Sequence, residues 1–171
     1  FKTGSKQAKS FDNFDQVWFF HPFLVIRMAS SSLGKDFYFI SSNWNGTQQE
    51  ELLASLSSKD CLICTLSITQ YQLNAQAFAA LCAAFQVNCT LLHVSLFRTD
   101  IGDPGCKLLA EALVANNTIT DLCLGADQIT DQSCTLISDA LRANYTLTRL
   151  RLNHNSITDY GMKHLCETLQ I

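Results

Sequence analysis

The sequence predicts an α/β solenoid, a horseshoe with a parallel sheet inside and helices outside. Three observations support this fold class. Apolar residues recur every 28 residues over the last two-thirds of the 171-residue chain. Each period divides into a strand half and a helix half, and each helix carries start and end signals. A unit of this size cannot bury its apolar face alone, so neighbouring units must stack into one core.

Six columns of apolar residues define the period. We expect each member to point into the shared interior, because a column repeats one position of the unit. The columns are Leu66, Val94, Leu122 and Leu150; Ile68, Leu96, Leu124 and Leu152; Leu73, Ile101, Ile129 and Ile157; Leu81, Leu109, Ile137 and Leu165; Phe85, Leu113, Leu141 and Leu169; and Ile63, Leu91, Ile119 and Leu147.

The last period shows the two halves of the unit most clearly. Leu150 and Leu152 alternate with polar residues, which predicts a short strand. Asn155 and Ile157 then turn the chain, and residues 160–169 have apolar residues at helical spacing. Parallel strands joined by helical crossovers form a curved stack, because the strands are spaced more closely than the bulkier helices.

The helix boundaries repeat with the same period. An aspartate stands two residues after the inward isoleucine, where it can accept hydrogen bonds from free N–H groups at the helix start. Pro104 follows at a first helical position, where a missing N–H costs nothing. The start signals are Asp103, Asp131 and Asp159. The end signals are Asn88, Asn116 and Asn144, followed two residues later by Thr90, Thr118 and Thr146.

The N-terminal third fits the period less well. Residues 37–60 are interpreted as a degenerate repeat whose helix, at 48–56, turns Leu52, Leu53 and Leu56 inward. Residues 1–36 are rich in aromatic residues and are interpreted as a cap over the open end of the stack or as a poorly ordered leader. The predicted repeat domain is therefore 37–171, with one degenerate and four 28-residue repeats. Because no polar closing repeat follows the last helix, we expect a longer array.

The repeat unit also resembles a known family. The pattern L-x-x-L-x-L-x-x-N-x-I-x-x-x-G, followed by an L-x-x-x-L helix, is most complete between Leu147 and Leu169 and resembles the ribonuclease-inhibitor type of leucine-rich repeat. This resemblance covers residues 61–171 and, weakly, 37–60. It implies a leucine-rich-repeat solenoid and a group that includes ribonuclease inhibitors, NOD-like receptors, tropomodulin-like actin caps and activators of Ran-type GTPases.

One position departs from the family pattern. The asparagine that usually bonds adjacent loop backbones is Asn155 in the last repeat, but Asp127, Thr99 and Tyr71 stand there in the earlier repeats. We therefore expect a less regular ladder of hydrogen bonds at those turns.

Composition and charge exclude several classes of function. A net charge of -3 and a pI near 5.7 argue against a dedicated nucleic-acid binder. The longest apolar run, 17–26, is shorter than the ~20 residues that cross a bilayer. No phosphate-binding loop, dinucleotide turn or metalloprotease helix is present. We expect a protein partner, with no nucleic acid, membrane, cofactor or metal; the oligomeric state stays open.

The eight cysteines do not suggest a disulfide scaffold. Cys106 and Cys134 share a column on neighbouring helices, whose axes lie about 8–10 Å apart, whereas a disulfide needs Cα atoms within about 7 Å. Cys61 and Cys89, each just before a strand, are the one pair that could bridge. A single C-x-x-C at 61–64 is a weak zinc signal. Reduced thiols and a cytoplasmic location are the preferred interpretation.

The strand residues between the inward positions face the concave side. This face is aromatic at its N-terminal end, hydroxyl-rich in the middle and basic at its C-terminal edge. Aromatic residues and arginines most often anchor interfaces, so we predict a binding surface with an exposed Phe97, the alternative being a merely solvated sheet. Its residues are Phe37, Phe39, His93, Phe97, Asp121, Cys123, Arg149, Arg151, Asn153 and His154.

One enzymatic alternative uses the same face. Cys123, His93 and Asp121 could serve as thiol, base and orienting acid, but an open sheet supplies neither oxyanion donors nor a closed pocket. Asp121 is expected to pair with Arg149 or His93 instead. We therefore predict no catalytic residue. Of the four N-x-T sequons, at Asn45, Asn88, Asn116 and Asn144, three coincide with the helix ends and need no glycan to explain them.

The leading hypothesis is a non-catalytic protein-recognition module that binds its partner in the hollow of the horseshoe. The family resemblance implies the sensing or regulatory part of a larger, NOD-like-receptor-like protein of innate immunity. The alternative is a direct enzyme inhibitor, or a regulator of GTPases or of the cytoskeleton, that uses the same face.

Overall fold

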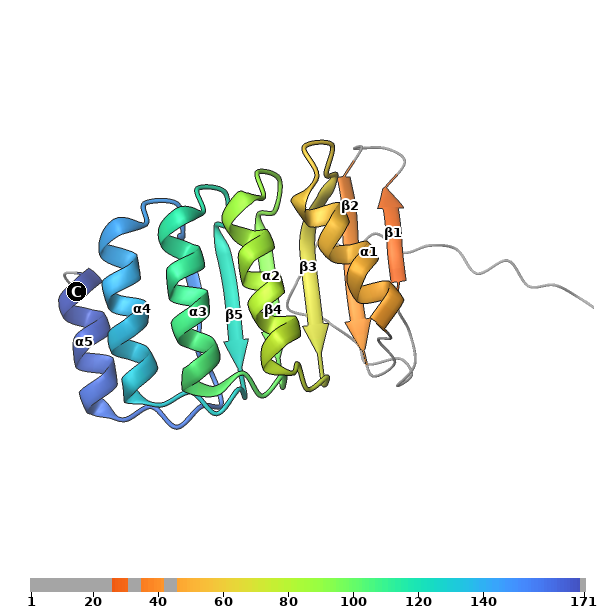
Figure 1. Ribbon diagram of the computed structural model, residues 1–171. Coiled ribbons are helices and arrows are strands. Elements are labelled where there is room, and N and C mark those ends of the chain that lie inside the picture. The colour runs from red at the N-terminus through yellow and green to blue at the C-terminus, as the bar shows by residue number, and fades with distance from the viewer. Residues whose placement is uncertain (1–25, 31–34, 42–45, 170–171) are drawn as a thin grey trace, which may run out of the picture.

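The computed structural model describes residues 26–30, 35–41 and 46–169, with side chains from residue 46 onward. Strands and helices alternate along the chain, and the helices cover one face of a single sheet (Figure 1). The elements are β1 (Ile26–Ser30), β2 (Lys35–Ser41), α1 (Gly46–Ser57), β3 (Ile63–Thr69), α2 (Ala75–Val87), β4 (His93–Phe97), α3 (Gly102–Ala115), β5 (Asp121–Gly125), α4 (Asp131–Ala143), β6 (Arg149–Arg151) and α5 (Asp159–Leu169).

The six strands lie side by side in chain order. From β2 to β6 the pairs are parallel and the register advances by 28 residues per strand: Thr65 pairs with His93, His93 with Asp121, and Asp121 with Arg149. From β2 onward each strand is joined to the next by one helix, so the predicted α/β repeat fold is confirmed.

The first strand differs from the others. β1 pairs with β2 in the antiparallel sense, with Ile26 opposite Phe39. It lies in the segment for which a cap or a leader is predicted, and an antiparallel strand was not foreseen there. Residues 1–25 and 31–34 lie outside the described residues, so the domain division at residue 36 stays a prediction.

The apolar columns form one continuous core between the sheet and the helices. Leu66, Leu96, Leu122 and Leu109 are fully buried, and so are Leu52 and Leu56 of α1. The last repeat departs from the expectation of uniform burial. Leu147, Leu150, Leu152 and Ile157 are half-buried and Leu169 is exposed. The reason is that, in the described part of the chain, no further unit packs against them.

The aspartates that repeat every 28 residues have a different role from the one predicted. Asp103 accepts hydrogen bonds from Thr130 N at 3.0 Å and Thr130 Oγ1 at 2.7 Å, and also from Ser133 Oγ. Asp131 accepts from Thr158 N and Oγ1 in the same way. Each aspartate therefore caps the start of the following helix rather than its own, which ties consecutive repeats together.

The asparagines at the helix ends form a buried ladder between repeats. Asn116 Nδ2 donates to Phe85 O at 2.7 Å and to Asn88 O at 3.2 Å, both in the preceding unit. Its Oδ1 accepts from Thr118 N and Ile119 N. Asn144 makes the corresponding bonds. Asn88 does so as well, except that its Nδ2 donates to Cys61 Sγ in place of a second carbonyl oxygen. All three asparagines are buried, which explains their sequons; Asn45 lies outside the described residues.

A second, less regular ladder crosses the turns after the strands. Asn155 Oδ1 accepts from Asp127 N at 2.9 Å and Ile129 N at 3.2 Å, and its Nδ2 donates to Leu124 O at 2.6 Å. Asp127 Oδ1 accepts from Thr99 N and Thr99 Oγ1. The carboxylate cannot donate, and its Oδ2 is buried without a hydrogen-bond partner. The less regular ladder expected from the sequence is therefore present, and its irregularity is the Asp127 Oδ2 atom, which has no hydrogen-bond partner.

Among the described residues, none of the helices has the length and apolar character needed to span a bilayer.

Candidate functional site

The side chains that alternate with the core leucines lie on the face of the sheet turned away from the helices. We call this surface the strand face. Its described residues come from β3 to β6 and from Asn153, two residues beyond Arg151, so the parallel register alone decides which of them are neighbours. They are Thr65, Ser67, Thr69, His93, Ser95, Phe97, Asp121, Cys123, Gly125, Arg149, Arg151 and Asn153.

The register places several of the predicted binding residues opposite one another on neighbouring strands. His93 lies opposite Asp121, which lies opposite Arg149, and Cys123 lies opposite Arg151. The backbones of Phe37 and Phe39 pair with Thr65 and Ser67, but the side chains of these two phenylalanines lie outside the described part of the chain.

Asp121 is the centre of a charge cluster at the β5–β6 edge. Its Oδ2 accepts a hydrogen bond from Arg149 Nη1 at 2.5 Å, and its Oδ1 accepts one from Arg151 Nη1 at 3.3 Å. Asp121 is only 8% exposed, whereas the Arg149 side chain is 61% exposed. The buried carboxylate therefore holds two guanidinium groups on the surface, and the cluster carries one net positive charge.

Phe97 is half-buried, contrary to the prediction that it is exposed. Its ring lies across Gly125: a Cβ added at Gly125 would stand 2.7 Å from Phe97 Cδ2. Arg98 covers the ring from another direction, with its Cζ 5.6 Å from the ring centroid. The ring can lie flat against the neighbouring strand because Gly125 has no side chain, and any side chain at Gly125 would occupy the space of the ring. Phe97 thus forms a low apolar platform.

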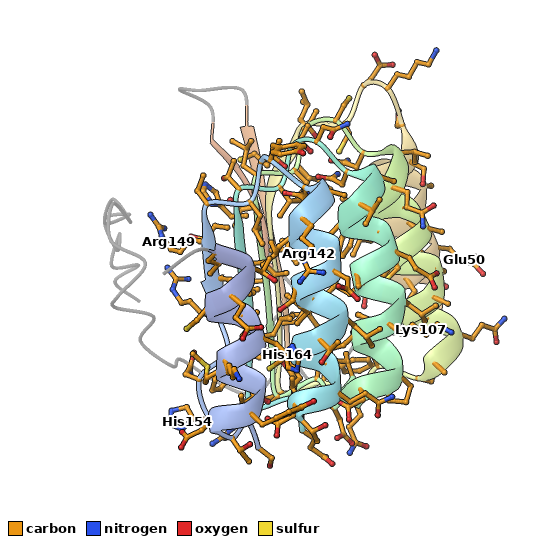
Figure 2. The ribbon with its side chains drawn as sticks, turned by 90° about the vertical axis from the view of Figure 1, so that its left-hand side faces the viewer. Glu50, Lys107, Arg142, Arg149, His154 and His164 are labelled. Carbon is orange, nitrogen blue, oxygen red and sulfur yellow. The ribbon has the colours of Figure 1, made fainter. Side chains whose placement is uncertain are left out.

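Asn153 and His154 lie beyond the end of β6, and both are exposed. Figure 2 shows His154 toward one end of the last repeat and Arg149 toward the other, with both on the side away from Lys107 and Glu50. The predicted basic edge therefore divides into a cluster around Asp121 and a separate histidine at the turn.

Two contributors to the site were not singled out from the sequence. They are Gly125, over which the Phe97 ring lies, and Arg98, which covers the ring. The signal for Arg98 was its place in the period: Arg98, Ala126 and His154 stand 28 residues apart, and all three have φ between 56° and 60°. This left-handed residue ends each strand, and so it lies at the edge of the strand face.

The thiol, imidazole and carboxylate considered for catalysis share the strand face, but Asp121 is bonded to the two arginines. Within residues 46–169, no group of three His, Cys, Asp or Glu side chains is arranged to hold a metal ion. Cys64 and Cys82 are buried on β3 and α2, and Cys61 is buried while Cys89 is exposed; none of the eight cysteines forms a disulfide.

Burial predicts the order in which the thiols react. Desolvation raises the pKa of Cys82 to about 12 and that of Cys106 and Cys134 to about 11. Since the thiolate is the reactive form, we expect an aromatic disulfide reagent at pH 8 to modify exposed Cys89 first. Half-buried Cys123 and Cys166 should follow, and the five buried cysteines should react only after unfolding.

The measurement is a time course of released chromophore in the native and the denatured protein. The Cys89→Ser variant serves as the control, because it should lack the first phase alone. Fast reaction of Cys123 in that variant would contradict the expected order and would revive the cysteine-enzyme alternative.

Comparisons with known proteins agree with this architecture. A family model described as "Leucine Rich repeat" matches residues 87–110 and 143–166, two segments that begin two repeat periods apart. A search of curated proteins finds no match.

Two solved structures share the fold. The chain is similar to leiomodin-1 actin-binding site 2, with 20% identity and a TM-score of 0.62 over 75% of each chain. It is also similar to a tropomodulin C-terminal domain from Caenorhabditis elegans, with 14% identity and a TM-score of 0.51, over 71% of this chain and 91% of that one. Identities this low bear on the fold alone. The chain therefore carries leucine-rich repeats, stacked in the α/β fold typical of such repeats.

Proposed function

We propose that this chain is a protein-recognition module that binds its partner through the strand face. The observation that carries the proposal is the Asp121–Arg149–Arg151 cluster, which shares the strand face with the Phe97 platform. An aromatic ring and arginines held in place by their neighbours are the side chains that most often anchor protein interfaces. Rigid strands position them, so little ordering entropy is lost when a partner binds.

The same geometry supports a non-enzymatic role. General acid–base chemistry needs groups within reach of a substrate that is shielded from water. On the strand face the carboxylate is already paired, and the arginines are open to solvent. The arrangement suits the binding of a surface better than the turnover of a small molecule.

Site-specific photo-crosslinking tests the proposal. A photoreactive phenylalanine analogue at Ser95, on the strand face, should crosslink a defined partner in cells. The same analogue at Glu111, exposed on α3, is the matched control and should not. Equal crosslinking from both positions, or from Glu111 alone, would contradict binding through the strand face.

The resemblance of the repeats to those of NOD-like receptors supports one cellular context. In this context the module is the recognition or regulatory part of a larger protein of innate immunity that acts in the cytoplasm. The free thiols suit a reducing compartment. The sequence that flanks this chain in its gene tests the idea, because a nucleotide-binding or death-fold segment upstream would support it.

The structural similarity to leiomodin-1 actin-binding site 2 supports a second context, a regulator of the cytoskeleton. A pyrene–actin polymerisation assay with the purified chain tests it. A change in the rate of assembly that is lost in Arg149→Glu/Arg151→Glu would support this context, and unchanged assembly together with no co-sedimentation would contradict it.

A further inference from the structure

We infer that the strand face at the β5–β6 edge binds an acidic, extended segment of a partner protein, with a carboxylate of that segment seated on Arg149 and Arg151. The inference rests on the proposed function and specifies the chemistry of the partner.

Charge on the two faces of the molecule favours such a segment. The charged side chains of the described strand face are Asp121, Arg149 and Arg151, with a net charge of +1, on a chain whose total is -3. The helix side carries the opposite sign, because α1 to α5 together hold eight aspartates and glutamates against three lysines and arginines. Glu111, Asp139 and Glu167 occupy one repeat position on α3, α4 and α5 and are exposed. An acidic segment is therefore repelled from the helices and attracted to the strand face.

Arg149 and Arg151 have N–H donors that Asp121 does not use. A guanidinium group has five N–H donors in a planar fork, and Asp121 takes one hydrogen bond from Nη1 of each arginine. Asp121 approaches from the neighbouring strand and is buried, whereas the Arg149 side chain is 61% exposed. Asp121 thus orients both groups without occupying their outer sides, where a second carboxylate can accept paired hydrogen bonds.

The Phe97 platform adds an apolar contact on the same face, two strands from Arg149 and Arg151. Its ring lies over Gly125, and Asn153 Nδ2 lies 3.2 Å from the position that a Gly125 Cβ would take. Asn153 is two residues beyond Arg151. Alternate residues of an extended chain point to the same side. The site therefore fits an extended segment whose acidic and apolar residues lie on the same side.

Fluorescence anisotropy with a defined probe tests the inference. The probe is a fluorescein-labelled peptide of Glu-Ser-Leu-Ser repeats, and the comparison peptides have Lys in place of Glu, or Ser in place of Leu. Arg149→Glu/Arg151→Glu should weaken binding by at least about tenfold, since two attractive charges become repulsive. Asp121→Asn should tighten binding, because it removes the internal competitor for the guanidinium groups.

Arg142→Glu is the matched control, because this arginine is equally exposed but lies on α4 in an ion pair with Asp139. It should leave binding of the Glu peptide unchanged. Arg149→Lys/Arg151→Lys keeps the charge and loses the forked geometry, so it should bind with intermediate affinity. Thermal melts verify that each variant is folded.

Three results would overturn the inference: equal binding of the Lys peptide, equal weakening by Arg142→Glu, or tighter binding of a single-stranded RNA oligonucleotide than of the Glu peptide. Photo-crosslinking distinguishes a failure of this inference from a failure of the proposed function. If photo-crosslinking at Ser95 captures a partner equally in the wild type and in Arg149→Glu/Arg151→Glu, recognition through the strand face stands and the acidic segment is wrong.

Discussion

Replacing Asn116 with aspartate is expected to lower the free energy of unfolding by about 3–5 kcal/mol at neutral pH, although the two side chains have nearly the same shape. Asn116 is 1% exposed, and its Nδ2 donates to Phe85 O and Asn88 O. Aspartate would turn a second acceptor toward these two carbonyl oxygens and would bury a charge without a counter-ion. Both backbone acceptors would lose their partner at once.

Urea denaturation monitored by circular dichroism measures the effect. The matched control is Asn117→Asp, one residue along the same loop, where the side chain is exposed; we expect a change within about 0.5 kcal/mol there. Similar losses for both variants would contradict the role of the buried ladder, because a general charge effect would then account for them.

The reverse exchange at the other ladder should stabilise the protein. Asp127→Asn is expected to raise the free energy of unfolding by about 1–3 kcal/mol at neutral pH. Asp127 is fully buried and its Oδ2 has no hydrogen-bond partner. At the same position one repeat later, Asn155 Nδ2 donates to Leu124 O and Leu152 O. By the 28-residue period, the corresponding acceptors for an amide at Asp127 are Leu96 O and Leu124 O.

The gain should depend on pH. Burial raises the pKa of Asp127, and hydrogen bonds from Thr99 and Asp100 offset only part of this rise. Between the ordinary value of 3.8 and the raised value, the folded chain binds more protons than the unfolded chain, so stability falls as the pH rises through this window. The advantage of Asp127→Asn should therefore be complete at neutral pH and shrink on acidification.

Two other aspartates titrate with the opposite sign. For Asp103, hydrogen bonds from Ser133 and Thr130 outweigh the effect of burial and lower its pKa, and hydrogen bonds from Thr158 lower that of Asp131. Their stabilisation is lost as the pH falls through the lowered values, which lie below the Asp127 window. Denaturation of wild type and Asp127→Asn between pH 7 and pH 4 isolates Asp127. Asp60→Asn, at an exposed site, serves as the control, and a gain that is the same at every pH would contradict the assignment.

The sequence predicted most of the fold because the period is a physical constraint. Apolar residues such as Leu96, Leu124 and Leu109 recur at the positions that face the shared core. Their spacing therefore predicts the strands, the helices, the strand register and the core from the sequence alone. The same register decides which strand-face residues lie opposite one another. The half-buried last repeat could not be derived from the period, because burial depends on what packs beyond each unit.

Repetition along the chain thus determined by itself which residues are neighbours, since a 28-residue shift carries each strand residue onto its partner. Only the tertiary structure decided what those neighbours do. Asp103 caps the following helix, Phe97 lies down on Gly125, and Asp121 holds both arginines. These outcomes depend on side-chain direction, competition for donors and burial, all of which are set by contacts between repeats.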